Sequence, residues 1–158
     1  RAVGACKGLT ELWFEHALVP DAGVAHLAEL PRLKELVLKG CVVGDAGVKH
    51  VARSQTMRLD LTESTVGDAG MKHVARSRVM VLDLTDTMVG DTGMKHLAAC
   101  PSLGVVRARR TPVTDAGLAA LAACERLRTV DVSGSKVTPA GVAAFEEARP
   151  GCRVITDR

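Results

Sequence analysis

One eleven-residue stretch recurs along this chain and constrains its fold more than any other feature. The stretch Val42 to Ala52 reads VVGDAGVKHVA, and five other copies, two close and three looser, begin at Thr65, Met88, Leu18, Pro112 and Lys136. The glycines of the six copies lie 24, 23, 23, 24 and 24 residues apart: Gly23, Gly47, Gly70, Gly93, Gly117 and Gly141. Self-similarity at a period in the twenties is typical of a solenoid, in which one small layer is stacked on the next.

The composition fits many small layers better than one deep pocket. The chain has 158 residues, a normal length for a single domain, and 47% of them are hydrophobic but only 2% aromatic. The net charge of +3 predicts no strong field for nucleic acid or a membrane. No apolar run approaches the roughly 18 residues of a membrane span. We therefore expect neither nucleic acid nor a membrane as partner.

Five cysteines, an odd number, stand in no metal-type CxxC spacing. Cys100 and Cys124 occupy the same place in adjacent repeats, as small hydrophobic layer fillers do. We expect free, buried thiols and a reducing compartment, with a cytoplasmic location; a zinc site or a catalytic thiol is the alternative. Because the chain begins at Arg1 and enters in mid-repeat, we expect residues 1–8 to be the tail of a preceding repeat.

Each repeat predicts a strand, a tight turn, a short helix and a return loop. Leu36 to Leu38 alternates with period two, as a strand with one buried face does. Asp45 follows where a helix begins, and its carboxylate is expected to satisfy free backbone N–H groups there. Gly47 is expected to let the helix start pack closely. In the last copy Pro139 takes the first helical position, so Thr138 is the predicted cap.

Such a unit cannot bury its apolar face alone, but stacked units can, with parallel strands on one side and helices on the other. The first strand is expected at Leu9 to Phe14, and later ones centre on 36–38, 59–61, 82–84, 106–108 and 130–132. Residues 152–158 are expected to add a terminal edge strand. The prediction is one α/β solenoid domain over residues 1–158, with about six repeats of 23–24 residues.

The run LxxLxLxxC/N, followed by a T/G-D-x-G element and an L/V-x-x-L/V pair, resembles the leucine-rich repeat. The helix-bearing 23–24-residue spacing is similar to ribonuclease-inhibitor-like repeats and to short bacterial variants, and the cysteine places resemble the repeats of F-box proteins. The resemblance implies a right-handed, curved solenoid with a concave sheet. It implies a binding function as well, because members of this family mostly bind other macromolecules. It also implies that the side chain after each strand, a hydroxyl in Ser64, Thr87, Thr111 and Ser135, bonds neighbouring backbone.

A column of helix residues, His26, His50, His73 and His96, suggests at first a metal site. Helices in such a stack lie roughly 8–10 Å apart, too far to share a zinc ion with bonds near 2 Å. We interpret these histidines as a partly exposed packing column. The lysines beside them, Lys49, Lys72 and Lys95, are expected to be a solvated face that is offset by Asp45, Asp68 and Asp91.

The outward strand positions on the concave side carry the candidate binding residues. One column is Trp13, Val37, Asp60, Asp83, Arg107 and Asp131; the next begins with Glu15 and Lys39, continues through Thr62 and Thr85, and ends with Arg109 and Ser133. Beside them stand His16, Gly40, Glu63, Asp86, Arg110 and Gly134. The surface therefore changes from an aromatic, mixed-charge end through an acidic centre to a basic group.

Three interpretations of this face compete. It is ordinary solvated sheet with Asp83 paired to Arg107, or it docks a protein of complementary charge with Trp13 as an apolar anchor, or its paired carboxylates bind a cation or catalyse. No Ser/His/Asp grouping, phosphate loop or dinucleotide motif is present. We expect a non-enzymatic protein-interaction module without a cofactor. A substrate-receptor role in a ubiquitin-ligase-type or effector complex, and a purely structural spacer, are the alternatives.

Overall fold

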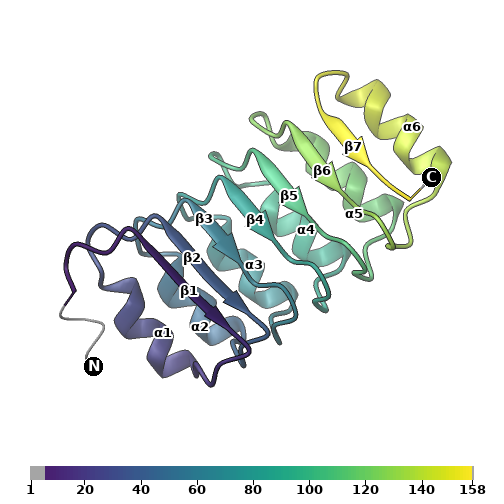
Figure 1. Cartoon of the computed structure of the whole chain (residues 1–158). Coiled ribbons are helices and arrows are strands. Elements are labelled where there is room, and N and C mark those ends of the chain that lie inside the picture. The colour runs from purple at the N-terminus through teal and green to yellow at the C-terminus, as the bar shows by residue number, and fades with distance from the viewer. Residues whose placement is uncertain (1–5, 158) are drawn as a thin grey trace.

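The computed structural model describes residues 6–157 and has all its strands in one parallel sheet (Figure 1). Each strand pairs with the next one along the chain, so the order is β1-β2-β3-β4-β5-β6-β7. The strands are β1 (Glu11–Glu15), β2 (Glu35–Lys39), β3 (Arg58–Asp60), β4 (Val81–Asp83), β5 (Val105–Arg107), β6 (Thr129–Asp131) and β7 (Arg153–Ile155). The first strand begins two residues later than predicted, β2 includes the predicted 36–38, and β3 to β6 each begin and end one residue before the predicted ranges.

The helices all lie on one side of the sheet, and one helix follows each of the first six strands (Figure 1). They are α1 (Asp21–Ala28), α2 (Asp45–Val51), α3 (Asp68–Val74), α4 (Asp91–Leu97), α5 (Asp115–Ala120) and α6 (Pro139–Ala148), and a 3₁₀ turn, η2 (Leu121–Ala123), follows α5. This open arrangement of alternating strands and helices confirms the predicted α/β solenoid. The expected repeat remnant at 1–8 lies largely outside the described residues.

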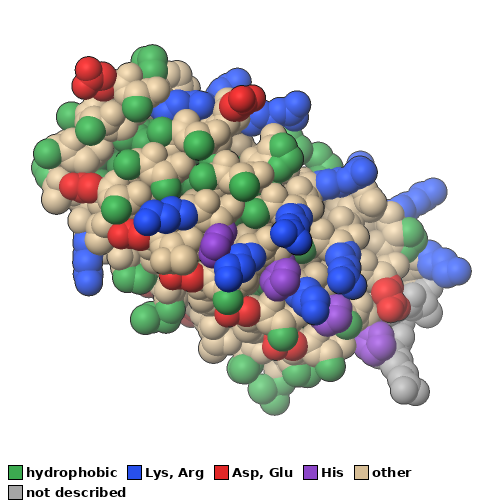
Figure 2. All heavy atoms as spheres, turned by 180° about the vertical axis from the view of Figure 1, so that it is seen from behind, with side chains coloured by type: hydrophobic (Ala, Val, Ile, Leu, Met, Phe, Trp, Pro, Cys, Tyr) green, Lys and Arg blue, Asp and Glu red, His purple; other side chains and the backbone are tan. Residues whose placement is uncertain are grey.

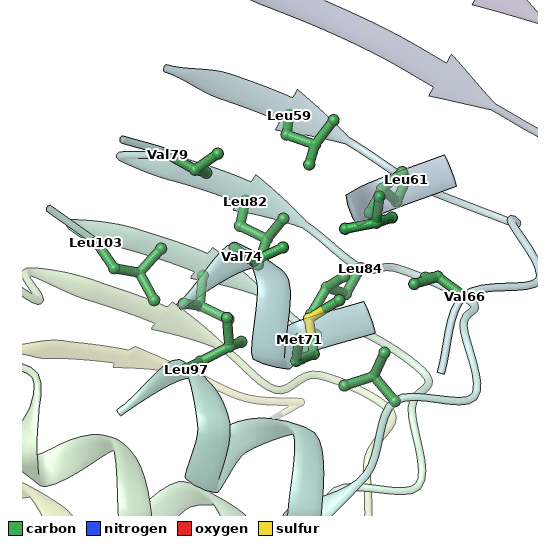
Figure 3. Close-up of a cluster of buried hydrophobic side chains, with 14 of the residues drawn as sticks. Leu59, Leu61, Val66, Met71, Val74, Val79, Leu82, Leu84, Leu97 and Leu103 are labelled. Carbon is green, nitrogen blue, oxygen red and sulfur yellow. The ribbon is translucent and has the colours of Figure 1, made fainter. Parts of the chain in front are cut away.

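The core is one thin apolar layer per repeat, continued from end to end. Leu59 on β3 and Leu82 on β4, with Leu61 and Leu84 directly after these strands, point toward helix residues such as Met71 (Figure 3). All five side chains are at most 1% exposed. Because every layer is covered by the next, burial is shared between repeats, and no repeat holds a core of its own.

The aspartate at each helix start does not cap its own helix, which corrects the prediction. Asp45 is the first helical residue, and its Oδ1 accepts a hydrogen bond of 2.9 Å from the backbone N–H of Gly67, the residue that precedes α3. Asp68 does the same for Gly90 at 2.7 Å and also accepts from Gly93 at 2.9 Å. These carboxylates therefore join each helix start to the following one. The predicted cap is confirmed at Thr138, whose hydroxyl accepts from the Gly141 N–H at 3.1 Å.

The repeated glycine of each helix from α2 to α6 makes room for the aspartate of the preceding repeat. A Cβ atom on Gly93 would lie 2.7 Å from Asp68 Oδ1 and 2.5 Å from a methyl carbon of Val89. Neither distance is compatible with a side chain, and both neighbours are held by the fold. The close contact is thus with the preceding repeat's carboxylate as well as with the repeat's own apolar anchor, a contact that the sequence did not predict.

The turn after each of the first six strands contains one residue with positive φ. Four of these residues are not glycine: His16, Glu63, Asp86 and Arg110 have φ between 49° and 58°. Their backbone N–H groups continue the parallel hydrogen bonding to the next repeat, as in Glu63 N to Thr85 O at 2.9 Å. The left-handed conformation therefore recurs by position, whatever residue occupies it.

The hydroxyls that follow the strands behave only in part as the resemblance implies. Thr87 and Thr111 donate to backbone carbonyls at 2.7 and 2.8 Å, and Ser135 accepts from the N–H of Val137. The buried hydroxyl of Ser64 has no partner within residues 6–157. Four of the five cysteines are buried free thiols, as predicted, whereas Cys6 is exposed.

Candidate functional site

The outward face of the sheet, here called the strand-lined face, carries no covering element among residues 6–157 (Figure 1). Its predicted first column is confirmed by the strand register, in which Trp13 aligns with Val37, Val37 with Asp60, and Asp60 with Asp83. The register continues through Arg107 and Asp131 to Ile155. The structure therefore brings the candidate residues onto one face of the sheet in the predicted order, although Asp131, at 2% exposure, and Val37, at 8%, are buried there.

The N-terminal end of the strand-lined face has an exposed aromatic side chain. Trp13 is 62% exposed, and its register partner Val37 is only 8% exposed. Glu15 and Lys39 are aligned on the same two strands. An indole that lies largely in solvent beside an apolar neighbour is a large contact area that the fold itself does not use.

The acidic centre is held by local hydrogen bonds. Asp60 and Asp83 are aligned on adjacent strands, an unfavourable arrangement for like charges. Asp60 accepts a hydrogen bond from the N–H of Thr62 at 2.9 Å, and Asp83 accepts from both the N–H and the hydroxyl of Thr85 at 3.1 and 2.6 Å. These carboxylates thus fix the turn that follows each strand, and the hydrogen bonds offset their mutual repulsion.

The basic group is not a free patch, because each arginine contacts a carboxylate on an adjacent repeat. Arg107 Nη1 lies 3.5 Å from Asp83 Oδ2, and Arg109 Nε lies 2.6 Å from Asp131 Oδ2. Arg110 forms a two-point contact with Asp86, with its Nε at 2.7 Å from Oδ1. The predicted Asp83–Arg107 pair is therefore present, and it is one of three that join repeats four, five and six.

Two of these carboxylates have a lowered pKa. Burial alone would raise the pKa of Asp131, but hydrogen bonds from the Ser133 hydroxyl and N–H, and from Arg109, outweigh it. For Asp86, the hydrogen bond from Arg110 is the main cause of the lowered pKa, against a smaller effect of burial. Both groups are therefore ionised at neutral pH and serve as fixed anchors for the arginines.

The charges without an ion pair within residues 6–157 lie nearer Trp13. Glu15, Lys39, Asp60 and Glu63 have no oppositely charged atom within 4 Å among these residues, although Asp60 is hydrogen-bonded locally. The strand-lined face thus combines a pre-arranged ion-pair half with an N-terminal half whose charged groups are available to a partner.

Sequence reasoning missed a further column on this face. Glu11, Glu35 and Arg58 are aligned at the strand starts, and Arg58 Nε lies 3.2 Å from Glu35 Oε1. The period of two could have identified them, because they stand two residues before Trp13, Val37 and Asp60.

The helix side carries the histidine column in a row with lysines and arginines around it (Figure 2). His26 is exposed, and His50, His73 and His96 are partly exposed, in agreement with a packing column. Lys49, Lys72 and Lys95 are exposed, as predicted, and form no ion pair within the described chain, because the neighbouring aspartates bind backbone N–H groups of the next repeat. The expected charge offset is present at Lys95, which contributes to the lowered pKa of Asp91. No group of three or more potential metal ligands occurs in residues 6–157.

No helix in the described part of the chain has the length and apolar character needed to cross a membrane. Two of the buried thiols lie in surroundings that disfavour the thiolate. Burial, the main cause, raises the pKa of Cys124 to about 11, and burial likewise raises the pKa of Cys152. Because the thiolate is the nucleophile and the metal ligand, Cys124 and Cys152 act as packing residues.

Comparisons with known proteins agree with this geometry. A family model described as "Leucine Rich repeat" matches residues 30–52, which is one repeat. Two similar solved structures are internalins of Listeria monocytogenes. One is described as inlF and has a TM-score of 0.65 at 19% identity. The alignment covers 97% of this chain and 48% of the inlF chain. The other is internalin C2, which has a TM-score of 0.58 at 15% identity. That alignment covers 98% of this chain and 84% of the internalin C2 chain. This chain thus spans about half the length of the first. No curated protein sequence matches it.

Proposed function

We propose that the chain is a non-catalytic module that binds another protein through its strand-lined face, because one of its repeats matches a leucine-rich repeat family model and its fold is similar to that of internalins. The observation that carries the proposal is Trp13, an indole 62% exposed at one end of an uncovered sheet. The proposed contact residues are Trp13, Glu15, Val37, Lys39, Asp60, Glu63, Asp83, Asp86, Arg107, Arg109, Arg110 and Asp131.

The charge arrangement supports a protein surface of mixed charge as the partner. Near Trp13 the side chains of Glu15, Lys39 and Glu63 are free to pair with groups of the opposite sign. A buried aromatic anchor surrounded by charges gives affinity at its centre and orientation at its rim. The ion-paired half further along holds Arg107, Arg109 and Arg110 in fixed positions, so a partner meets a surface that needs little ordering.

The setting of the thiols fits a reducing compartment, and we place the protein in the cytoplasm on this basis. Cys41, Cys100, Cys124 and Cys152 are single buried thiols within the apolar layers. They fill space as small hydrophobic residues do and do not require an oxidising environment.

Affinity capture with two face variants tests the proposal. We expect a protein that the wild type retains to be lost with Trp13→Ala, which removes the anchor, and with Glu63→Lys, which reverses a free charge. Both side chains are exposed, so both variants should keep the fold. The captured proteins are quantified by mass spectrometry, and the fold of each variant is checked by circular dichroism.

Leu18→Ala is the matched control. Leu18 is 90% exposed but lies in the loop between β1 and α1, outside the strand-lined face. A partner that is retained by both face variants and lost with Leu18→Ala would overturn the proposal, as would a partner that all three variants retain equally.

A further inference from the structure

A groove crosses the edge of the solenoid at which the return loops enter the strands, away from the strand-lined face. It has a volume of about 750 Å³ and is lined by nine residues from the first four repeats. This volume is within the range of about 300–1,000 Å³ that is usual for ligand-binding clefts. Four adjacent strands spaced about 4.8 Å apart give it a length of roughly 14 Å, which matches about four residues of extended peptide.

The sequence explains why the edge is hollow there. The return loops of repeats two and three are one residue shorter than the loops that flank them: Ala52 and Leu59, like Ala75 and Leu82, are seven positions apart, whereas Ala28 and Leu36, like Ala98 and Val106, are eight apart. Each short loop is closed by a buried serine: Ser54 and Ser77 both donate to a helix carbonyl at 2.7 Å. Two consecutive short loops between two longer ones therefore leave a depression across the middle of the edge.

The floor of the groove is apolar and exposed. Met57 and Met80 occupy the position just before β3 and β4 and are 40% and 41% exposed, although both belong to an otherwise well-packed edge. Gly104, at the same position before β5, has no side chain to cover Met80. Methionine adapts its shape to varied apolar partners and is enriched at binding surfaces.

The rim is predominantly basic. Arg32 and Arg78 rise from the return loops, and Lys34 stands beside Met57, all three exposed. Arg78 Nη1 donates to Gln55 Oε1 at 3.1 Å, which keeps the guanidinium at the rim. None of the three has a carboxylate within 4 Å among residues 6–157.

A smaller hollow of about 370 Å³ shares Lys34 and Met57 with the groove and leads toward the strand-lined face. It is bordered by Glu11 and by Glu35, which is paired with Arg58. Negative charge is therefore repelled at this side and attracted at the return-loop side, so that a ligand with both apolar and acidic groups has one favoured orientation.

We propose that this groove is a second binding site, distinct from the strand-lined face, for a short extended peptide segment with apolar side chains flanked by acidic residues. The apolar side chains lie on Met57 and Met80, and the carboxylates pair with Arg32, Lys34 and Arg78. The site lies on a different surface from Trp13, so a partner bound on the strand-lined face leaves it accessible.

The test uses the full chain with ¹³C-labelled methionine methyl groups and a capped hexapeptide in which two leucines stand between two pairs of glutamates. The chain has five methionines, so each signal reports on one place. We expect the Met57 and Met80 signals to shift on titration. Met71 and Met94 are fully buried and Met88 is 75% exposed on another edge, so their signals should not move.

Two substitutions of exposed methionines and a second peptide complete the test. Met80→Glu places a negative charge in the groove and should weaken binding about tenfold or more, whereas Met88→Glu should leave it unchanged. A peptide with lysines in place of the glutamates should not bind. Equal binding of both peptides, equal shifts at Met88, or an unchanged affinity of Met80→Glu would each overturn the proposal.

Discussion

At the scale of single residues, an aspartate carboxylate supplies the hydrogen-bond acceptor that backbone N–H groups at a helix start lack. The first N–H groups of a helix have no partner within it. Here they are satisfied from the preceding repeat: Asp68 accepts from Gly90 and Gly93, and Asp91 from the N–H and hydroxyl of Thr114. Burial would raise the pKa of Asp91, but these hydrogen bonds hold it below its usual value. One carboxylate therefore stabilises two repeats at once.

Replacing Asp68 with alanine tests this role. The change leaves two backbone N–H groups without their acceptor, so we expect the free energy of unfolding to fall by about 2–3 kcal/mol. Asp68→Asn keeps one acceptor oxygen without the charge and should cost about half as much. Urea unfolding measures both, with Glu146→Ala, an exposed charge on α6, as the control. Equal stability of the alanine variant and the control would contradict the assignment.

At the scale of the element, the repeat period predicted each strand and helix, but not the conformations that join them. Helix starts and buried strand positions follow from spacing alone, because each is marked by an apolar or helix-starting residue in every copy. The left-handed turn could not be predicted in the same way. Glycine at Gly40 and Gly134 is compatible with positive φ, but His16, Glu63, Asp86 and Arg110 at the same position give no such indication.

The same limit applies to the candidate site. Alternation predicted which side chains point outward, because it depends only on the backbone. One of the three interpretations included the Asp83–Arg107 pair, but alternation did not predict that Arg109 contacts Asp131 on the following repeat, since long side chains can reach neighbours on either side. The expected basic patch was therefore wrong in its charge balance, although its residues lie where they were predicted to be.

The left-handed turn leads to a prediction for Glu63. Its φ of 58° is unfavourable for a residue with a side chain, and glycine occupies the equivalent position in two other repeats. Glu63→Gly should raise the free energy of unfolding by about 0.5–1 kcal/mol, the relieved strain being reduced by the greater freedom of glycine in the unfolded chain. Asp86→Gly is the matched control, because it relieves the same strain but loses the contact with Arg110. Thermal unfolding that shows the same gain for both variants would contradict this account.

At the scale of the whole molecule, the structure is a stack in which each layer meets only its neighbours. Each helix contacts the next helix and each strand pairs with the next strand, from β1 to β7. The free energy of such a stack is close to a sum over layers and interfaces. Each of the helices α2 to α5 packs between two other helices, whereas α6 packs against one helix, α5, and the strand β7 in the described part of the chain. The effect of a core substitution should therefore depend on where in the stack it falls.

Phe145 on α6, at 2% exposure, is the largest buried side chain of the last layer. Its replacement tests whether the effect of a core substitution depends on its place in the stack. Phe145→Ala should cost about 3–5 kcal/mol within that layer. Because the penalty falls at the end of the stack, amide hydrogen exchange should accelerate in α6 and β7 and stay slow in β2 and α2. Leu59→Ala in β3, an interior layer at 1% exposure, should instead accelerate exchange on both sides of the substitution. If Phe145→Ala accelerates exchange equally in all seven strands, the stack unfolds as one cooperative unit, and the layer-by-layer account of its stability is wrong.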